Sequence, residues 1–224
     1  MNFNDKTISV VIGGTSGIGR AVAQKLRTRP GHVEIAGRST GLDVADSAAV
    51  ASYFQRLGKV DHHVVFTAGS QAPGGRIVEV EIEAAKAAFD VKFWGSVIIA
   101  REAAKAIRPG GTITLTSGFL SRRTVAGTYV KTAMNAAIEA VAKILAKELA
   151  PIRVNVVSPG LTDTEAYQAM DAPARQAMLA RASTSLPAGR HGEPDDLARA
   201  YLFAIDNPFV TGAVIDVDGG ALIN

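Results

Sequence analysis

Val10-Val11-Ile12-Gly13-Gly14-Thr15-Ser16-Gly17-Ile18-Gly19-Arg20 joins an apolar, β-branched run to a segment with helical spacing. Residues 7–12 predict a buried strand, and residues 17–27 predict a helix. In such a turn Gly13 suits the tight bend, Gly17 lets backbone approach a pyrophosphate, and Gly19 lets the helix pack closely. The positive end of the helix dipole then faces the phosphates. The stretch predicts a dinucleotide-binding turn, with a purely structural turn as the alternative.

Strands and helices alternate along the rest of the chain. β-branched runs predict further strands, and apolar residues at helical spacing predict further helices, one of them starting near Asp46. This alternation favours a parallel sheet covered on both faces. We therefore expect an α/β fold, a Rossmann-type doubly wound parallel sheet with helices on both faces, in a single domain of residues 1–224. The expected strands are 32–36, 61–66, 112–116, 152–157 and 214–217, and the expected helices are 81–107, 132–150 and 194–205.

Composition excludes several classes of protein. The 224 residues include no cysteine, which excludes disulfides, thiolate zinc sites and a cysteine nucleophile. The net charge of +3 comes from 24 basic and 21 acidic residues that are interspersed, so no nucleic-acid partner is expected. The four histidines lack metal-ligand spacing, so no metal is expected. The N-terminus does not resemble a signal peptide, and the apolar runs are too short to span a membrane, so we expect a cytoplasmic protein without a membrane partner.

The glycine spacing resembles the T-G-x-x-x-G-x-G turn of the short-chain dehydrogenase/reductase family, with Ile12 in place of the threonine. The resemblance extends over nearly the whole chain. Thr67-Ala68-Gly69 is similar to the end of the family's N-N-A-G segment, with both asparagines replaced. The run 152–160, which ends in Pro159-Gly160, resembles the strand and turn beside the nicotinamide. Residues 186–190, 211–212 and 218–220 match the family's C-terminal pattern.

The end of the second expected strand bears on which dinucleotide is bound. Family members that prefer NAD usually carry an acid there, whereas this chain has Gly37 followed by Arg38. An arginine suits a 2′-phosphate, and the hydroxyls of Ser39 and Thr15 could add donors. NADP(H) is therefore expected rather than NAD(H), although Arg38 as a solvated loop charge stays open. The stretch 38–43 is too short for the helix that most relatives have there.

Asp43-Val44 resembles the family's D-V pair beside the adenine, and Asp43 as a cap of the following helix is the alternative. Thr162 and Thr164 stand where the family contacts the carboxamide and the phosphates. The residues assigned to the cofactor are Gly13, Thr15, Ser16, Gly17, Ile18, Gly19, Arg38, Ser39, Asp43, Val44, Ala68, Gly69, Pro159, Gly160, Thr162 and Thr164.

The family's catalytic residues are an asparagine, a serine, a tyrosine and a lysine, and this chain departs from that pattern. Aligned backward from Glu148-Leu149, their places hold Lys92, Gly118, Lys131 and Asn135. Aligned from Ile152 instead, Thr116 takes the serine place, Tyr129 the tyrosine place and Ala133 the lysine place. We favour the first alignment, because two extra residues within a helix would rotate its apolar face.

Substitutes for the missing acid are conceivable in either alignment. Tyr129 could reach the nicotinamide from a loop before the helix, and Ser117 could take over the serine role. Lys131 or Lys92 could act as the acid if burial lowers its pKa. The candidate catalytic residues are thus Ser117, Tyr129, Lys131 and Lys92. Residues 163–185 lie where relatives have a mobile substrate lid.

The resemblance implies an NADP(H)-dependent oxidoreductase that acts on a small carbonyl or alcohol substrate through an atypical active site. The alternative is a non-catalytic NADP(H)-binding sensor or assembly protein, since function depends on the site and not on the fold. Family members are usually homodimers or homotetramers that associate through the helices corresponding to 81–107 and 132–150, and we expect the same here.

Overall fold

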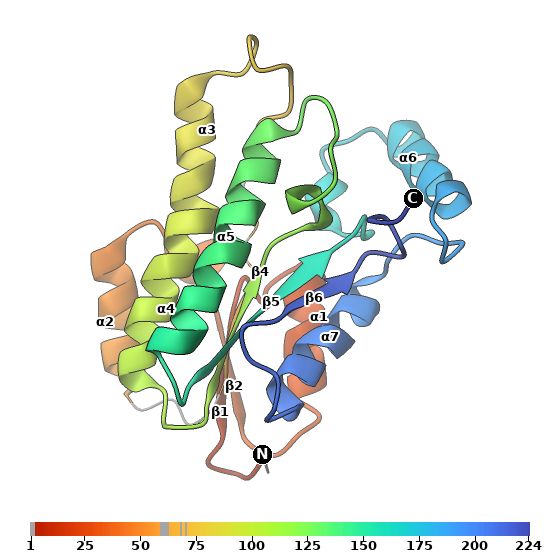
Figure 1. Ribbon diagram of the computed structural model, residues 1–224. Coiled ribbons are helices and arrows are strands. Elements are labelled where there is room, and N and C mark those ends of the chain that lie inside the picture. The colour runs from red at the N-terminus through yellow and green to blue at the C-terminus, as the bar shows by residue number, and fades with distance from the viewer. Residues whose placement is uncertain (1–2, 59–62, 68, 70) are drawn as a thin grey trace.

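The computed structural model describes residues 3–58, 63–67, 69 and 71–224, and shows a central sheet between two layers of helices (Figure 1). The sheet has six strands in the order β2-β1-β3-β4-β5-β6, and every neighbouring pair is parallel. The chain reverses direction of winding at β1, which lies between β2 and β3. The predicted doubly wound fold is confirmed. The strands are β1 (Ile8–Ile12), β2 (His32–Ala36), β3 (His63–Phe66), β4 (Thr112–Thr116), β5 (Arg153–Pro159) and β6 (Val214–Val217).

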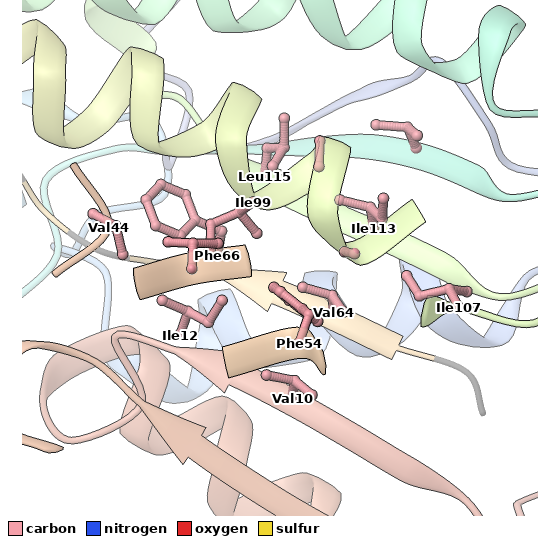
Figure 2. Close-up of a cluster of buried hydrophobic side chains, with 14 of the residues drawn as sticks. Val10, Ile12, Val44, Phe54, Val64, Phe66, Ile99, Ile107, Ile113 and Leu115 are labelled. Atoms are coloured by element: carbon pink, nitrogen blue, oxygen red, sulfur yellow. The ribbon is translucent and has the colours of Figure 1, made fainter. Parts of the chain in front are cut away.

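Alternate residues of the strands pack against different helical layers, as the two-residue repeat of a strand requires. Val10 and Ile12 of β1 belong to a core shared with α2, α4 and α5, and Figure 2 shows them beneath Phe66 and Ile99. Val11 faces the opposite core, which is shared with α1 and α7. The helices are α1 (Gly17–Leu26), α2 (Ser47–Leu57), α3 (Ile82–Phe89), α4 (Gly95–Ala106), α5 (Tyr129–Glu148), α6 (Ala172–Ser185) and α7 (Pro194–Asp206).

The helix expected over 81–107 is not α-helical throughout. It consists of α3, a π-helical turn η2 (Asp90–Trp94) and α4, which follow one another without a break in Figure 1. A π-helical turn inside an α-helix is uncommon and often marks a functional position. Periodicity alone cannot reveal it, because one extra residue within a turn changes the apolar spacing only locally.

Other boundaries also differ from expectation. Helix α5 begins at Tyr129, three residues before the expected start at 132, so Tyr129 does not lie in a preceding loop. Helix α6 was not expected, because no apolar stripe marks it, and none of its residues is buried. The stretch 38–43 contains only a short 3-10 turn, η1 (Arg38–Thr40). Residues 61 and 62 of the third expected strand lie outside the described residues. No helix in the described part of the chain is long and apolar enough to cross a membrane.

The close packing of α1 on the glycine turn generates the first prediction. A Cβ on Gly19 would lie 2.2 Å from the carbonyl oxygen of Gly13 and 2.3 Å from Oγ1 of Thr67, so the backbone would have to move. We expect Gly19→Ala to lower the free energy of unfolding in urea by about 2 to 3 kcal/mol, the usual cost of overpacking. Gly74→Ala is the control, since its Cβ would lie 3.6 Å from its nearest neighbour, an ordinary contact. Equal unfolding curves for the two variants would contradict this account of the turn.

Candidate functional site

The amino end of α1 lies at the carboxyl edge of the sheet, directly after β1. Gly13 has a φ of 86° and Gly17 a φ of 48°, conformations that favour glycine. Ser16 is the N-cap residue but makes no capping hydrogen bond with its side chain. The N–H of Gly17 instead donates to Oε2 of Glu165 at 2.8 Å, a residue 148 positions away in the sequence. The turn therefore presents an N–H group to an anionic oxygen, which here belongs to the protein's own Glu165.

A contact between two side-chain hydroxyls joins the segment after β2 to the glycine turn. Ser39 Oγ lies 3.3 Å from Thr15 Oγ1, which joins η1 to the turn after β1. Thr40 fixes the conformation of η1, because its hydroxyl accepts from Gly37 N–H at 2.9 Å and donates to Gly37 O at 3.0 Å. Arg38 is exposed at the start of the same turn. Two separate segments therefore meet at one surface: the glycine turn with Thr15, and η1 with Arg38 and Ser39.

The next residues that the sequence assigned to the cofactor are Asp43 and Val44, which follow η1. Asp43 accepts from the N–H of Ala45 at 3.0 Å, whereas Asp46 caps α2 by accepting from Ala48 and Ala49. The alternative that Asp43 caps this helix is therefore wrong. Val44 is buried in the core, so only its backbone can face a ligand. Ala68 lies outside the described residues, and Gly69 is exposed.

The turn after β5 lies beside the glycine turn. A Cβ on Gly160 would lie 2.5 Å from Cα of Asp218, so Pro159-Gly160 packs directly on the segment after β6. Thr162 is buried, and its hydroxyl donates to Gly160 O at 3.1 Å, which commits that side chain to the turn itself. The side chain of Thr164 lies 3.3 Å from the position of a Cβ on Gly17. Of the two threonines, Thr164 is the one beside the amino end of α1.

Lys92 joins the π-helical turn to the end of β4 and to α5. Its ammonium donates to Ser117 O at 2.9 Å and to Oδ1 of Asn135 at 2.7 Å. Removal from water, with a further contribution from the charge of Lys131, lowers the pKa of Lys92 to about 8. The low-dielectric surroundings therefore bring this group close to the range in which a lysine exchanges protons at neutral pH.

The four positions that the favoured alignment matches to the family's catalytic residues lie close together in the structure. Asn135 Nδ2 lies 2.9 Å from the position of a Cβ on Gly118, and Asn135 also accepts from Lys92. Lys131 is four residues before Asn135 on α5, one helical turn away, and is exposed. The positions at 92, 118, 131 and 135 thus form one cluster at the carboxyl edge of the sheet.

The other two candidate catalytic residues, Ser117 and Tyr129, have different surroundings. Ser117 is buried, and its hydroxyl donates to Oε1 of Glu139 at 2.8 Å, away from Lys92, which contacts only its carbonyl oxygen. Tyr129 and Thr132 line a separate cavity of about 290 Å³, together with residues of the 75–77 and 124–127 loops. Lys131 lies about 200° around the helix from Tyr129. Among the described residues, neither Ser117 Oγ nor the Tyr129 hydroxyl makes a hydrogen bond to Lys92.

A buried carboxylate that the sequence did not single out organises the loop after β4. Glu139 accepts from the hydroxyls of Ser117 and Ser121, and its Oε2 lies 3.2 Å from Nε of Arg122. Arg122 also donates to Asp216 on β6 at 2.8 Å. Only its position on the inner face of α5 could have indicated this role. Within the described residues, no group of three or more His, Cys, Asp or Glu side chains could hold a metal ion.

Comparison with known proteins gives consistent matches over most of the chain. A family model described as enoyl-(acyl carrier protein) reductase matches residues 27–221. A short-chain dehydrogenase/reductase, ucsE of Acremonium sp., is 30% identical over 98% of this chain and 96% of its own length. Carbonyl reductase family member 4 of Danio rerio is 31% identical over 95% of this chain and 97% of its own. The crystal structure of a small-chain dehydrogenase in complex with NADPH is 57% identical, covers 98% of this chain and all of that one, and has a TM-score of 0.96.

The lowered pKa of Lys92 generates a prediction about stability. Between about 8, its value in the folded protein, and 10.5, its ordinary value, the unfolded chain binds more protons at this residue. Folding stability from Lys92 therefore rises with pH across this window. The unfolding free energy of wild type minus that of Lys92→Met should increase from pH 8 to pH 10.5. The slope should stay below about 1.4 kcal/mol per pH unit, the limit for the difference of one bound proton.

Lys86→Met on α3 is the control, because Lys86 is exposed and pairs with Glu83, one turn away. Its difference from wild type should not change over the same window. Chemical denaturation at several pH values measures both differences. A flat profile for Lys92→Met would contradict a desolvated ammonium at this position.

Proposed function

Because the chain belongs to the short-chain dehydrogenase/reductase family, we propose that it is an NADP(H)-dependent oxidoreductase of a small carbonyl or alcohol substrate. The observation that carries the proposal is the cluster of Lys92, Lys131 and Asn135 at the same edge of the sheet as the glycine turn. A relative that is named a carbonyl reductase and a neighbour that binds NADPH support the substrate class and the cofactor.

The residues at the carboxyl edge fit a phosphorylated dinucleotide. Gly17 offers an N–H at the positive end of α1, where an anion is favoured. Arg38, with Ser39 and Thr15 beside it, offers a charge and hydroxyls for a 2′-phosphate, and no acid stands at Gly37 to repel it. Bound NADPH would supply the hydride that reduces a carbonyl carbon.

The proton for the substrate oxygen would come from a lysine. Lys131 stands at the family's tyrosine place, is exposed, and carries a charge that acts on Lys92. As the hydride reaches the carbonyl carbon, Lys131 would donate a proton to the oxygen and recover it from solvent. Two ammonium groups beside the developing negative charge on oxygen would stabilise it electrostatically.

Lys92 and Asn135 would position this acid. In the favoured alignment they exchange the family's places, so that the lysine comes from the π-helical turn and the asparagine from α5, and the two side chains contact each other. Ser117 O and Asn135 Oδ1 accept two of the three N–H groups of Lys92. The third N–H is the one that would face the substrate oxygen.

The cofactor proposal predicts a preference that depends on Arg38. We expect wild type to bind NADPH more tightly than NADH, and Arg38→Ala to weaken NADPH binding about 10- to 100-fold while leaving NADH unchanged, because only NADPH has the 2′-phosphate. Titrations followed by cofactor fluorescence measure both affinities. Arg56→Ala removes an exposed arginine from α2 and controls for general charge effects. Equal losses for both dinucleotides would contradict the assignment of Arg38.

The acid proposal predicts a loss of turnover without a loss of cofactor binding. Lys131→Met should lower kcat for reduction of para-nitrobenzaldehyde or ethyl acetoacetate by about 100-fold or more, the usual contribution of a general acid. The Kd for NADPH should stay close to that of wild type. Lys143→Met, an exposed lysine three turns along the same helix, should retain activity. Undiminished kcat in Lys131→Met would remove this residue from the mechanism, and NADPH binding without turnover of any carbonyl by wild type would favour the non-catalytic alternative.

A further inference from the structure

The segment that follows β5 lies across the amino end of α1. We call residues 161–185 the covering segment, which includes η4 (Glu165–Tyr167) and α6. In Figure 1, α6 lies at the upper right, beyond the carboxyl ends of β5 and β6. None of the residues of α6 is buried, so this helix contributes little apolar surface to the core. Its position depends on polar contacts.

Glu165 of η4 makes two contacts that join the covering segment to α1. One carboxylate oxygen accepts from the N–H of Gly17 at 2.8 Å, and the other pairs with the guanidinium of Arg20 on the first turns of α1. Hydrogen bonds from its own backbone N–H, from Arg20 and from Gly17 lower the pKa of the Glu165 carboxyl, against the opposing effect of burial. The group is therefore a carboxylate at neutral pH and occupies the positive end of the helix.

Polar contacts within the covering segment join α6 to the residues next to Glu165. Arg175 of α6 donates from Nε to Oδ1 of Asp163 at 3.1 Å and from Nη2 to the carbonyl oxygen of Thr164 at 3.3 Å. Thr164 itself packs on Gly17. A displacement of Glu165 is thus transmitted to α6 through two neighbouring residues, and it uncovers little apolar surface.

A carboxylate and a pyrophosphate require the same features at this place: an N–H donor, the positive helix end and a cation. We propose that Glu165 is a latch, which holds the covering segment over the amino end of α1 and competes with the pyrophosphate of the dinucleotide for Gly17 N–H and Arg20. The proposal rests on the proposed function and adds a device that regulates access to its cofactor site. Release of Glu165 makes the guanidinium of Arg20 available to the entering anion.

The test compares Glu165→Gln with wild type. A glutamine keeps the shape and can still accept from Gly17, but it lacks the charge that pairs with Arg20 and competes with phosphate. We expect Glu165→Gln to bind NADPH about tenfold more tightly, and inorganic pyrophosphate likewise, by calorimetry. Without ligand, the variant should unfold at a lower urea concentration than wild type.

Asp195→Asn is the matched control. Asp195 lies in the same surface groove as Gly17 and Arg20 but pairs with Lys25, so its substitution removes one negative charge without touching Gly17. Its affinity for NADPH should change by about twofold or less. Arg175→Ala is a second variant, which loosens the hold of α6 on the covering segment without altering α1, and it should also tighten NADPH binding.

The outcomes separate the latch from the proposed function. Unchanged or weaker NADPH binding by both Glu165→Gln and Arg175→Ala, with wild type binding normally, would overturn the latch and leave the oxidoreductase proposal intact. If NADPH bound neither wild type nor Glu165→Gln while pyrophosphate bound the variant more tightly, the latch would stand and the cofactor proposal would fall. If neither ligand bound Glu165→Gln at millimolar concentration, the latch would be wrong.

Discussion

The rest of the structure depends on the close approach of α1 to the end of β1. Only a residue without a side chain fits at position 19, because the carbonyl oxygen of Gly13 and the hydroxyl of Thr67 fill the space where a Cβ would lie. This contact places the positive end of the helix at the carboxyl edge of the sheet. On the other side, Val22 and Leu26 fix α1 in the core that it shares with α7. Close packing on both sides therefore fixes the position of the amino end of α1, and the carboxylate of Glu165 meets its positive end there.

Removing the Lys92 ammonium from water costs free energy, and neighbouring oxygen atoms offset part of this cost. The Lys92 ammonium loses water and lies near a second lysine, and both effects lower its pKa. The carbonyl oxygen of Ser117 and the amide oxygen of Asn135 replace water as acceptors without bringing a full negative charge. Both acceptors are neutral, so they hold the ammonium without cancelling its charge. The nearby carboxylate of Glu139 is meanwhile engaged by Arg122 and two serine hydroxyls.

The architecture could be predicted because it depends on local patterns, whereas much of the site could not. β-Branched runs and the glycine spacing between Ile12 and Arg20 indicated the parallel sheet and its first turn. The contact between Gly17 and Glu165 joins residues 148 positions apart, and no local pattern encodes it. Helix α6 escaped prediction because none of its faces is buried, so it has no apolar stripe. The start of α5 was placed three residues late, and this error left Tyr129 in a loop when it is the first residue of the helix.

The π-helical turn places Lys92 where its side chain contacts both the end of β4 and α5. In a π-turn the hydrogen bonds skip one residue further than in an α-helix, which widens the turn locally and re-aims its side chains. Lys92 lies in the middle of this turn, and its carbonyl oxygen accepts from the N–H of Gly95 and from the buried hydroxyl of Ser96 at 2.6 Å. From that backbone position a long side chain reaches both Ser117 O and Asn135. On α5, the shorter side chain of Asn135 places its amide nitrogen 2.9 Å from the position of a Cβ on Gly118. The contact between Lys92 and Asn135 therefore depends on the geometry of the π-helical turn as well as on the lengths of the two side chains.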